Sequence, residues 1–507
     1  QLGALSASQV GLLNATNLSA LDANQIAALT STQIGGLTTT QLRALDSTDL
    51  AEVTATQIGV LSRTQVGALA ATQISGLDAA QTAGLTSTQL VGLTAAQVGG
   101  LNETDIAELS TTQLAAFSAV QVGQLSTTAF SALDQTQVES LSVTQIRGAT
   151  TTQIAGLTTG DVSEFTATQI AAFSVAQLGA ISTTNLAGLT TTQIGSLSAT
   201  HVSSLTTTNF AALSAEQVGA LNATQIRGVT AAQVAALSTT DVQELNETQI
   251  AALNTTQLAA FNATNMAALS TTQLTGLSAS QIGSLSRTNL SALDETQFAS
   301  LSETQVRGLT TVQLAALSTT DLGELTETQV DALTRTQIGA LSGTQVSNLT
   351  ATQAAALNAT QLGALNMSQL RALNAADVAE LSATQIEAFS ATQVGQLTTT
   401  AFAAFDATHV AALTTTQFRG VTAAQIGALN ETDIGELTET QIGALLTTQF
   451  SALTATNLSA LNSTQSNALT TTQMSWLSTA QVQGLTETAV AQFTTTQLGA
   501  LNSGQVG

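Results

Sequence analysis

The sequence predicts an all-α solenoid of about 63 octapeptide repeats, with one short capped helix in each repeat. Three observations lead to this fold class. An apolar residue, nearly always Leu, recurs every eight residues from Leu5 to Leu501 without an insertion or a deletion. The positions that follow it read Ser/Thr-x-Thr-Gln, which is a helix-start signature. Pro is absent from all 507 residues, which suits an uninterrupted series of helices.

We number the octad positions as columns one to eight: Leu, then Ser/Thr/Asn/Asp, any residue, Thr, Gln, Ile/Val/Leu, a small residue, and Ala or Gly. In a capping box, the N-cap oxygen accepts the N–H of position N3, and the Gln at N3 accepts the N–H of the N-cap. Columns one and six then provide the two apolar residues of a hydrophobic staple. The segment Leu37–Leu42 fills every one of these positions. Each octad therefore predicts a helix with its N-cap in column two.

Each helix must end before the next N-cap, because an N-cap has a non-helical backbone. About six or seven helical residues remain, fewer than two turns, and such a helix is unstable alone. Neighbouring octads must therefore stack as a solenoid. A β-solenoid is the alternative, because Thr-x-Thr steps and the β-branched residues of column six suit strands. The apolar columns do not alternate with period two, which favours the α-solenoid.

Composition excludes several classes of function. The formal net charge is −23, with nine Arg and no Lys, which argues against binding of nucleic acid or an anionic membrane surface. No apolar run reaches about 18 residues, so we expect no membrane span. The absence of Cys excludes disulfides and thiolate metal sites. The chain opens with Gln1 rather than Met, so we expect a processed protein or a segment of a longer one.

A longer periodicity lies above the octad. Residues 105–164 match residues 377–436 at an offset of 34 octads, and the segments that begin at Arg147 and Arg227 resemble each other at an offset of ten octads. Duplication of blocks of octads explains both offsets. Because the octad never breaks, we interpret residues 1–507 as a single continuous repeat array.

One variant octad stands out, because Asp replaces Gln in column five and Glu then always fills column eight. The seven pairs are Asp49 and Glu52, Asp105 and Glu108, Asp161 and Glu164, Asp241 and Glu244, Asp321 and Glu324, Asp377 and Glu380, and Asp433 and Glu436. The two residues of a pair are three positions apart, on one helix face. Successive pairs are separated by seven or ten octads. With about 3.4 octads per superhelical turn, or about 27 residues, all seven would form one acidic stripe along the solenoid.

We consider three roles for this stripe. It is a solvated acidic patch spread by duplication, a contact surface for a partner or a neighbouring rod, or a binding site for a cation such as Ca²⁺. Ca²⁺ takes six to eight oxygen ligands, so two carboxylates per octad are too few alone. We therefore expect no cofactor, and the sequence assigns no metal site.

Arg residues in column seven precede the Asp of a pair at one constant spacing. The four cases are Arg147 before Asp161, Arg227 before Asp241, Arg307 before Asp321, and Arg419 before Asp433. An Arg–carboxylate contact between turns or between rods is therefore a further expectation.

The other candidate residues for chemistry give no functional pattern. His201 and His409 stand in the Gln column, far apart in sequence, and we interpret them as capping substitutes. Ser and Thr are abundant, but a nucleophile needs a base placed beside it. No such constellation is visible, so the sequence predicts no catalytic residue, no cofactor-binding residue and no enzyme.

Octads such as Leu189–Leu197 (LTTTQIGSL) and Leu269–Leu277 (LSTTQLTGL) resemble the octapeptide-repeat regions of large bacterial surface and secreted proteins, including adhesin-like and filament proteins. The resemblance covers the whole chain. It implies an extracellular or cell-surface structural role and transfers no functional residue. The Gly-Asp nonapeptides of calcium-binding β-rolls are absent, so the resemblance does not imply dependence on calcium.

These observations predict a non-enzymatic structural protein, an extracellular solenoid rod that forms or belongs to a surface filament, layer or adhesin stalk. Its expected partner is another copy of itself, with no nucleic acid and no membrane span. The alternative is a binding module that presents regular rows of Thr and Ser to a lattice such as ice or a polysaccharide.

Overall fold

The structure, a computed structural model, describes residues 1–507 and contains 63 short α-helices, α1 to α63, preceded by one 3-10 helix at Leu2–Ala4. No residue is in a strand. The prediction of an all-α solenoid is confirmed, and the β-solenoid alternative is wrong, because every Thr-Gln segment is helical.

The helix boundaries follow one rule. Each helix begins in column three, so helix αn begins at residue 8n − 1, from α1 (Ala7–Val10) to α63 (Ser503–Val506). The helices of four residues are α1, α8, α11, α36, α45, α49, α56, α62 and α63. The helices of six residues are α5, α7, α10, α13, α15, α17, α18, α21, α22, α25, α28, α30, α31, α35, α37, α38, α39, α41, α42, α44, α46, α51, α54, α55 and α61. All the others have five residues.

Helix α5 (Thr39–Ala44) shows why the octad starts and stops a helix. The N–H of Gln41 donates to Oγ1 of Thr38 at 3.2 Å, and the N–H of Thr38 donates to Oε1 of Gln41 at 2.7 Å, which completes the predicted capping box. Leu45, in column one of the next octad, has an extended backbone with φ −60° and ψ 135°. The extended residues of columns one and two end each helix and lead the chain into the next.

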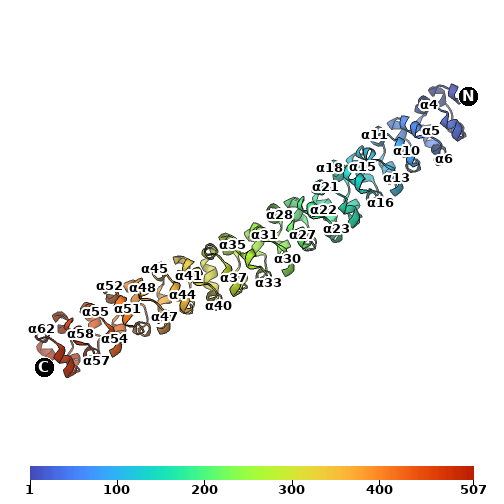
Figure 1. Cartoon of the computed structure of the whole chain (residues 1–507). Coiled ribbons are helices and arrows are strands. Elements are labelled where there is room, and N and C mark those ends of the chain that lie inside the picture. Colours follow the sequence, from blue (N-terminus) through green and yellow to red (C-terminus); the bar gives the residue numbers. More distant parts are fainter. The chain divides into compact units, whose positions relative to one another are not determined.

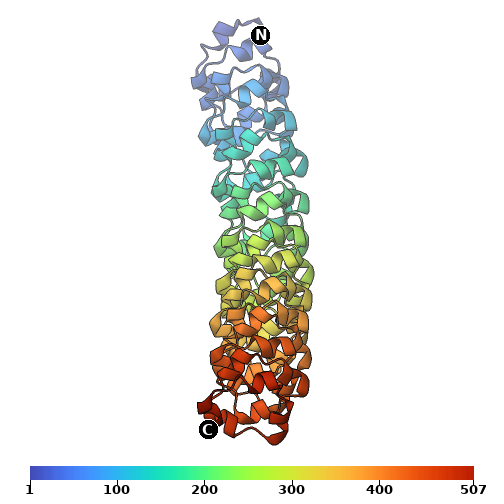
Figure 2. The same cartoon turned by 90° about the vertical axis from the view of Figure 1, so that its left-hand side faces the viewer.

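The chain divides into two units, residues 1–253 and residues 254–507, and we describe each by itself. In both units a helix contacts the helix three octads further along the chain, for example α15 (Ala119–Gln124) with α18 (Val143–Gly148), and α35 (Ala279–Ser284) with α38 (Glu303–Gly308). Figures 1 and 2 show the helices of each unit following one another in successive turns. Each unit is therefore a solenoid in which every turn packs on the next.

Hydrogen bonds between turns give the size of one turn. Gln41 bonds to Leu13 and Val10, which lie 28 and 31 residues before it, and Arg43 bonds to Ala68, which lies 25 residues after it. A turn therefore takes more than three octads and fewer than four, in agreement with the predicted value of about 3.4.

The core of each unit consists of columns one and six. Leu269 in column one is 2% exposed, and Leu274 in column six is fully buried, as expected for a staple. The same two columns are buried along most of both units, except near the two ends of the chain. None of the helices combines the length and the apolarity needed to cross a lipid bilayer.

Small residues in columns seven and eight let the turns approach closely. Gly148, the last residue of α18, lies against the backbone of Ala119 at the start of α15. A Cβ atom added at Gly148 would clash with the carbonyl oxygen of Ala119. The same clash with an Ala at the start of an earlier helix would arise at Gly228, Gly308 and Gly420, so this close contact recurs with the duplicated blocks.

We expect Gly148→Ala to lower the free energy of unfolding of its turn by about 1–3 kcal/mol, the usual cost of overpacking. Gly179 in α22 (Val175–Ala180) is the matched control, because a Cβ atom there meets nothing within 4 Å. Gly179→Ala should raise stability by about 0.5–1 kcal/mol, since Ala is the better helix former. Urea unfolding of both variants measures the difference. Equal shifts for the two variants would show that the close contact does not matter.

Candidate functional site

The Gln of column five is the central polar residue of the structure. In α12 (Ala95–Gly99), Oε1 of Gln97 accepts the N–H of Thr94 at 2.7 Å. Its Nε2 donates to the carbonyl oxygens of Val66 and Leu69, each at 2.8 Å, in the preceding turn. Gln97 is 1% exposed. One buried amide thus caps the start of its own helix and also satisfies two backbone carbonyls of the turn before it.

The capping box predicts that the Gln side-chain oxygen accepts the N-cap N–H, but it does not predict that the amide nitrogen donates to the preceding turn. The sequence also indicates the donor role of the amide: Glu serves a capping box as well as Gln does, yet column five never holds Glu. A carboxylate accepts the N-cap N–H but has no hydrogen to donate to a carbonyl. The exclusion of Glu therefore indicates that both ends of the amide are used.

The residues that replace Gln retain as much of this role as their chemistry allows. His409 accepts the N–H of Asp406 at Nδ1 (3.4 Å) and bonds the carbonyl oxygen of Leu381 through Nε2 at 2.6 Å. The shorter Asn185 reaches only the column-one carbonyl of Leu157, at 2.7 Å. The prediction that the His residues are capping substitutes agrees with these contacts.

His201 gives a prediction with a defined pH sign. Burial lowers the pKa of His201, while a hydrogen bond to the backbone of Phe173 partly opposes this shift. The neutral ring is needed because Nδ1 accepts the N–H of Ser198 at 3.3 Å. Since the folded pKa lies below the unfolded value of about 6.5, the contribution of His201 to stability is complete above that pH and is lost as the pH falls through the folded pKa.

We expect His201→Gln to remove this acid-dependent loss and to stabilise its turn by about 1 kcal/mol, because Gln adds a bond to a second carbonyl. Hydrogen exchange of the peptides around residues 170–205, corrected for intrinsic rates and compared between about pH 7.5 and about pH 5, tests the variant, because the loss is expected below the unfolded pKa of about 6.5. An unchanged pH dependence would contradict the assignment.

The seven Asp-x-x-Glu octads interrupt the series of Gln amides. Each Asp keeps the capping half of the role: the N–H of Ser318, for example, donates to Oδ2 of Asp321 at 3.1 Å. No Asp can donate to the preceding turn. In five octads a Ser of that turn, 30 residues earlier, donates its hydroxyl to Oδ2 of the Asp instead; the pairs are Ser19–Asp49, Ser75–Asp105, Ser131–Asp161, Ser291–Asp321 and Ser347–Asp377.

In six of the seven octads the Glu is partly buried in the solenoid, whereas Glu380 is exposed. In five octads the Oε2 atom of the Glu is buried and has no hydrogen-bond partner; these residues are Glu52, Glu108, Glu164, Glu244 and Glu324. Burial raises the pKa of four of the Glu residues above the usual value, and the Asp three residues earlier raises it further; these are Glu164, Glu244, Glu324 and Glu436. A raised pKa means that the stability contribution is complete at acidic pH and is lost as the pH rises through the folded pKa.

Acidic N-caps of the preceding turn also face these octads. Column two holds six Asp residues. Five of them lie 30 residues before the Glu of a pair, the same spacing as between Ser291 and Asp321. The five cases are Asp22 before Glu52, Asp78 before Glu108, Asp134 before Glu164, Asp294 before Glu324, and Asp406 before Glu436. The last three of these Asp residues raise the pKa of their Glu. This relation is not visible within one octad, because it needs the number of residues per turn.

The carboxylates do not form a recognisable metal site, since no group of three or more His, Asp or Glu side chains has the arrangement needed to hold an ion. Whether all seven pairs lie in one stripe stays a prediction, and so do a partner contact and Ca²⁺ binding there.

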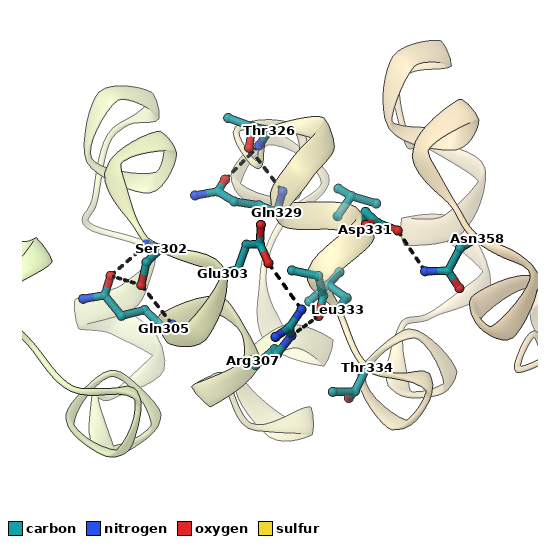
Figure 3. Close-up of polar contacts among 12 residues, drawn as sticks. Ser302, Glu303, Gln305, Arg307, Thr326, Gln329, Asp331, Leu333, Thr334 and Asn358 are labelled. Carbon is teal, nitrogen blue, oxygen red and sulfur yellow. Dashed lines mark hydrogen bonds and ion pairs between the residues drawn. The ribbon is translucent and has the colours of Figure 1, made fainter.

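Three column-seven Arg residues bind backbone instead of the acidic octads. Nε of Arg43, Arg147 and Arg307 donates to the carbonyl oxygens of Ala68, Ala172 and Ala332 at 3.1–3.2 Å. Ala172 and Ala332 are the last residues of their helices, and Ala68 lies two residues after the end of one, where a cation is favourable. Figure 3 shows Arg307 between its exposed ion pair with Glu303, at 3.3 Å, and α41 (Glu327–Ala332) of the next turn. These Arg residues therefore join successive turns.

Comparison with known families agrees with the repeat architecture. The ALTTAQ repeat family matches four segments of the chain, residues 154–191, 170–207, 250–287 and 306–343. The name of the family corresponds to columns eight to five of the octad, as in Ala412–Gln417 (ALTTTQ). The chain is thus a repeat protein. A search of the curated proteins finds no match.

Proposed function

We propose that the protein is a non-enzymatic structural solenoid that lies outside the cell, as part of a surface filament, layer or adhesin stalk. One observation carries the proposal: the column-five amide joins successive turns in most octads, so the same bonding is repeated along both units. A chain built in this way gains length and cohesion with each added octad.

The residue types that elsewhere perform catalysis serve the scaffold here. The hydroxyls of Ser302 and Thr326 accept the N–H groups of Gln305 and Gln329 as N-caps (Figure 3). His409 bonds two backbone groups at once. A nucleophile needs a base free to accept its proton, and these side chains are already engaged in the repeat. This supports a structural role over an enzymatic one.

The surface composition supports a place outside the cell. Charged residues make up only 8% of the chain, and the exposed columns hold mostly Thr, Ser and other small or polar residues. The resemblance to bacterial surface repeats points the same way. Immunogold labelling of the source cells with an antibody against the chain tests this location. Label on cell-surface filaments or layers supports the proposal, and label confined to the cell interior overturns it.

Self-association is the second part of the proposal. Sedimentation of the purified chain over a wide concentration range should show assemblies that grow with concentration. A monomer at all concentrations, together with isolated particles in electron microscopy of native material, would contradict a filament role.

Binding to a lattice is a second candidate function. Column four, which is usually Thr, is exposed along both units and therefore repeats at regular intervals. Ice-recrystallisation inhibition by the purified chain, or its retention on an insoluble polysaccharide, would favour this candidate over the rod.

A further inference from the structure

Each Asp-x-x-Glu octad leaves one backbone carbonyl of the preceding turn without a donor. In a regular octad, the column-one carbonyl accepts a hydrogen bond only from the Gln amide 28 residues later, as Leu301 does from Gln329 at 2.7 Å. Where Asp replaces Gln, no donor reaches this carbonyl. The seven carbonyls belong to Leu21, Leu77, Leu133, Leu213, Leu293, Leu349 and Phe405. Five of these residues are buried, namely Leu77, Leu133, Leu213, Leu293 and Phe405. A buried carbonyl without a donor costs about 1–3 kcal/mol, so these octads are weak points between turns.

In two octads the Glu lines a small cavity together with the residue that carries the unsatisfied carbonyl. A small cavity of about 10 Å³ is lined by Leu213, Asp241 and Glu244. A second cavity, of about 20 Å³, is lined by Leu349, Asp377 and Glu380. In two octads, one in each unit, the residue with the open carbonyl, the Asp and the Glu thus share one space.

The column-one carbonyl oxygen and Oε2 of the Glu both lack a hydrogen-bond donor. The carbonyl lacks a donor, and Oε2 of Glu324, like that of four other Glu residues, is buried without a partner. An ionised carboxylate has no hydrogen to donate, whereas a protonated carboxyl has one. The Asp cannot supply the hydrogen, since its Oδ2 already accepts the N-cap N–H and, in Asp321, the hydroxyl of Ser291 at 2.8 Å.

We propose that the Asp-x-x-Glu octads of Glu164, Glu244, Glu324 and Glu436 are proton-operated joints of the solenoid. In the closed joint, the protonated carboxyl of the column-eight Glu donates its hydrogen to the column-one carbonyl of the preceding turn, in place of the absent Gln amide. When the carboxyl ionises, the bond is lost, the carboxylate moves toward solvent, and contact between the two turns loosens. Regular octads remain closed in both states, so the response is confined to these four joints.

The charges around Glu324 favour its neutral form. Asp321 lies on its own helix α40 (Thr319–Gly323), and Asp294 and Glu295 face it from the preceding turn. From the following turn, Gln353 donates to the carbonyls of Leu322, Gly323 and Leu325, which flank Glu324. The octad of Gln353, residues 349–356, carries no charged side chain. No cation therefore opposes the three carboxylates, and acidification closes the joint.

Hydrogen exchange of the full chain, read by mass spectrometry and corrected for intrinsic rates, tests the proposal at about pH 4.5 and about pH 7.5, either side of the range in which a raised Glu pKa lies. Peptides from 286–325 should exchange several-fold faster at the higher pH. Glu324→Gln, which carries donor hydrogens at every pH, should keep this joint slow at both values. The joint at Asp433 and Glu436 serves as the internal control and should keep the wild-type response.

A second variant covers the case in which Glu324→Gln disturbs the fold. Asp321→Gln combined with Glu324→Ala recreates the polar pattern of residues 309–316, with Gln in column five and Ala in column eight. This joint should also stay closed at both pH values. A wild-type pH response in either folded variant overturns the proposal. So does closure of the wild-type joint by CaCl₂ at about pH 7.5, because a cation rather than a proton would then operate it.

Discussion

Replacing Gln369 with Leu is expected to lower the free energy of unfolding of the surrounding turns by about 3 kcal/mol or more. Gln369 is completely buried in α46 (Met367–Ala372). Its Oε1 accepts the N–H of Asn366 at 2.8 Å, and its Nε2 donates to Ile338 and Leu341 at 2.7 and 2.8 Å. Leu has a similar volume but leaves these three backbone groups without this partner. Each buried group that loses its only partner costs about 1–3 kcal/mol.

A short series of variants separates the two halves of the amide's role. Gln369→His should cost least, because His409 already fills both roles at the same position of another octad. Gln369→Glu should cost about as much as Leu or more near neutral pH, since it brings a carboxylate against two carbonyl oxygens. Gln135→Leu, at an exposed column-three position, is the control and should change stability by less than about 0.5 kcal/mol. Hydrogen exchange of residues 338–372 measures the local loss. A cost for Leu no greater than the cost for His would show that the inter-turn bonds do not matter.

The fold was predictable because the octad specifies a helix start locally. The capping box and the staple lie within six consecutive residues, as in Leu37–Leu42, so no knowledge of the neighbouring turns was needed. The spacing of the acidic pairs further indicated a turn of about 27 residues, and the contacts of Gln41 and Arg43 agree with it. The helix lengths were less predictable, because they depend on how the last residues of each octad pack on the next turn.

The candidate site was predictable only in part, because its partners are distant in sequence. The pairing of Asp321 with Glu324 was visible in one octad, but Ser291 and Asp294 belong to the preceding turn. A solvated acidic patch was one of the three roles considered for these octads, and the structure buries Oε2 of Glu324. Ser291-Ala292-Leu293-Asp294 recurs as Ser-x-Leu-Asp before three other pairs, always at the same spacing from the Asp of the pair. Comparing octads at the spacing of one turn would have found this relation.

Replacing Leu269 with Asp should lower the free energy of unfolding still more, by about 4 kcal/mol or more. Leu269 is 2% exposed, and its carbonyl oxygen accepts the amide of Gln297 at 2.7 Å. The change removes a buried side chain, which alone costs about 2–5 kcal/mol, and it adds a carboxylate that the core leaves unpaired. Because a solenoid is stabilised by contacts between neighbouring turns, the loss should be local: protease cleavage and fast hydrogen exchange should appear near residues 262–300 and fade within a few turns.

Val312→Asp is the control for Leu269→Asp in the same unit. Val312 is 66% exposed and lies near the start of α39 (Thr311–Ala316), where an anion is favourable, so its replacement should leave stability nearly unchanged. Leu269→Asp places a carboxylate in the core, and Val312→Asp places one on the surface. Only the core substitution should open the neighbouring turns. Unchanged protease resistance around residue 269 in the first variant would contradict the packing of columns one and six as the core of the protein.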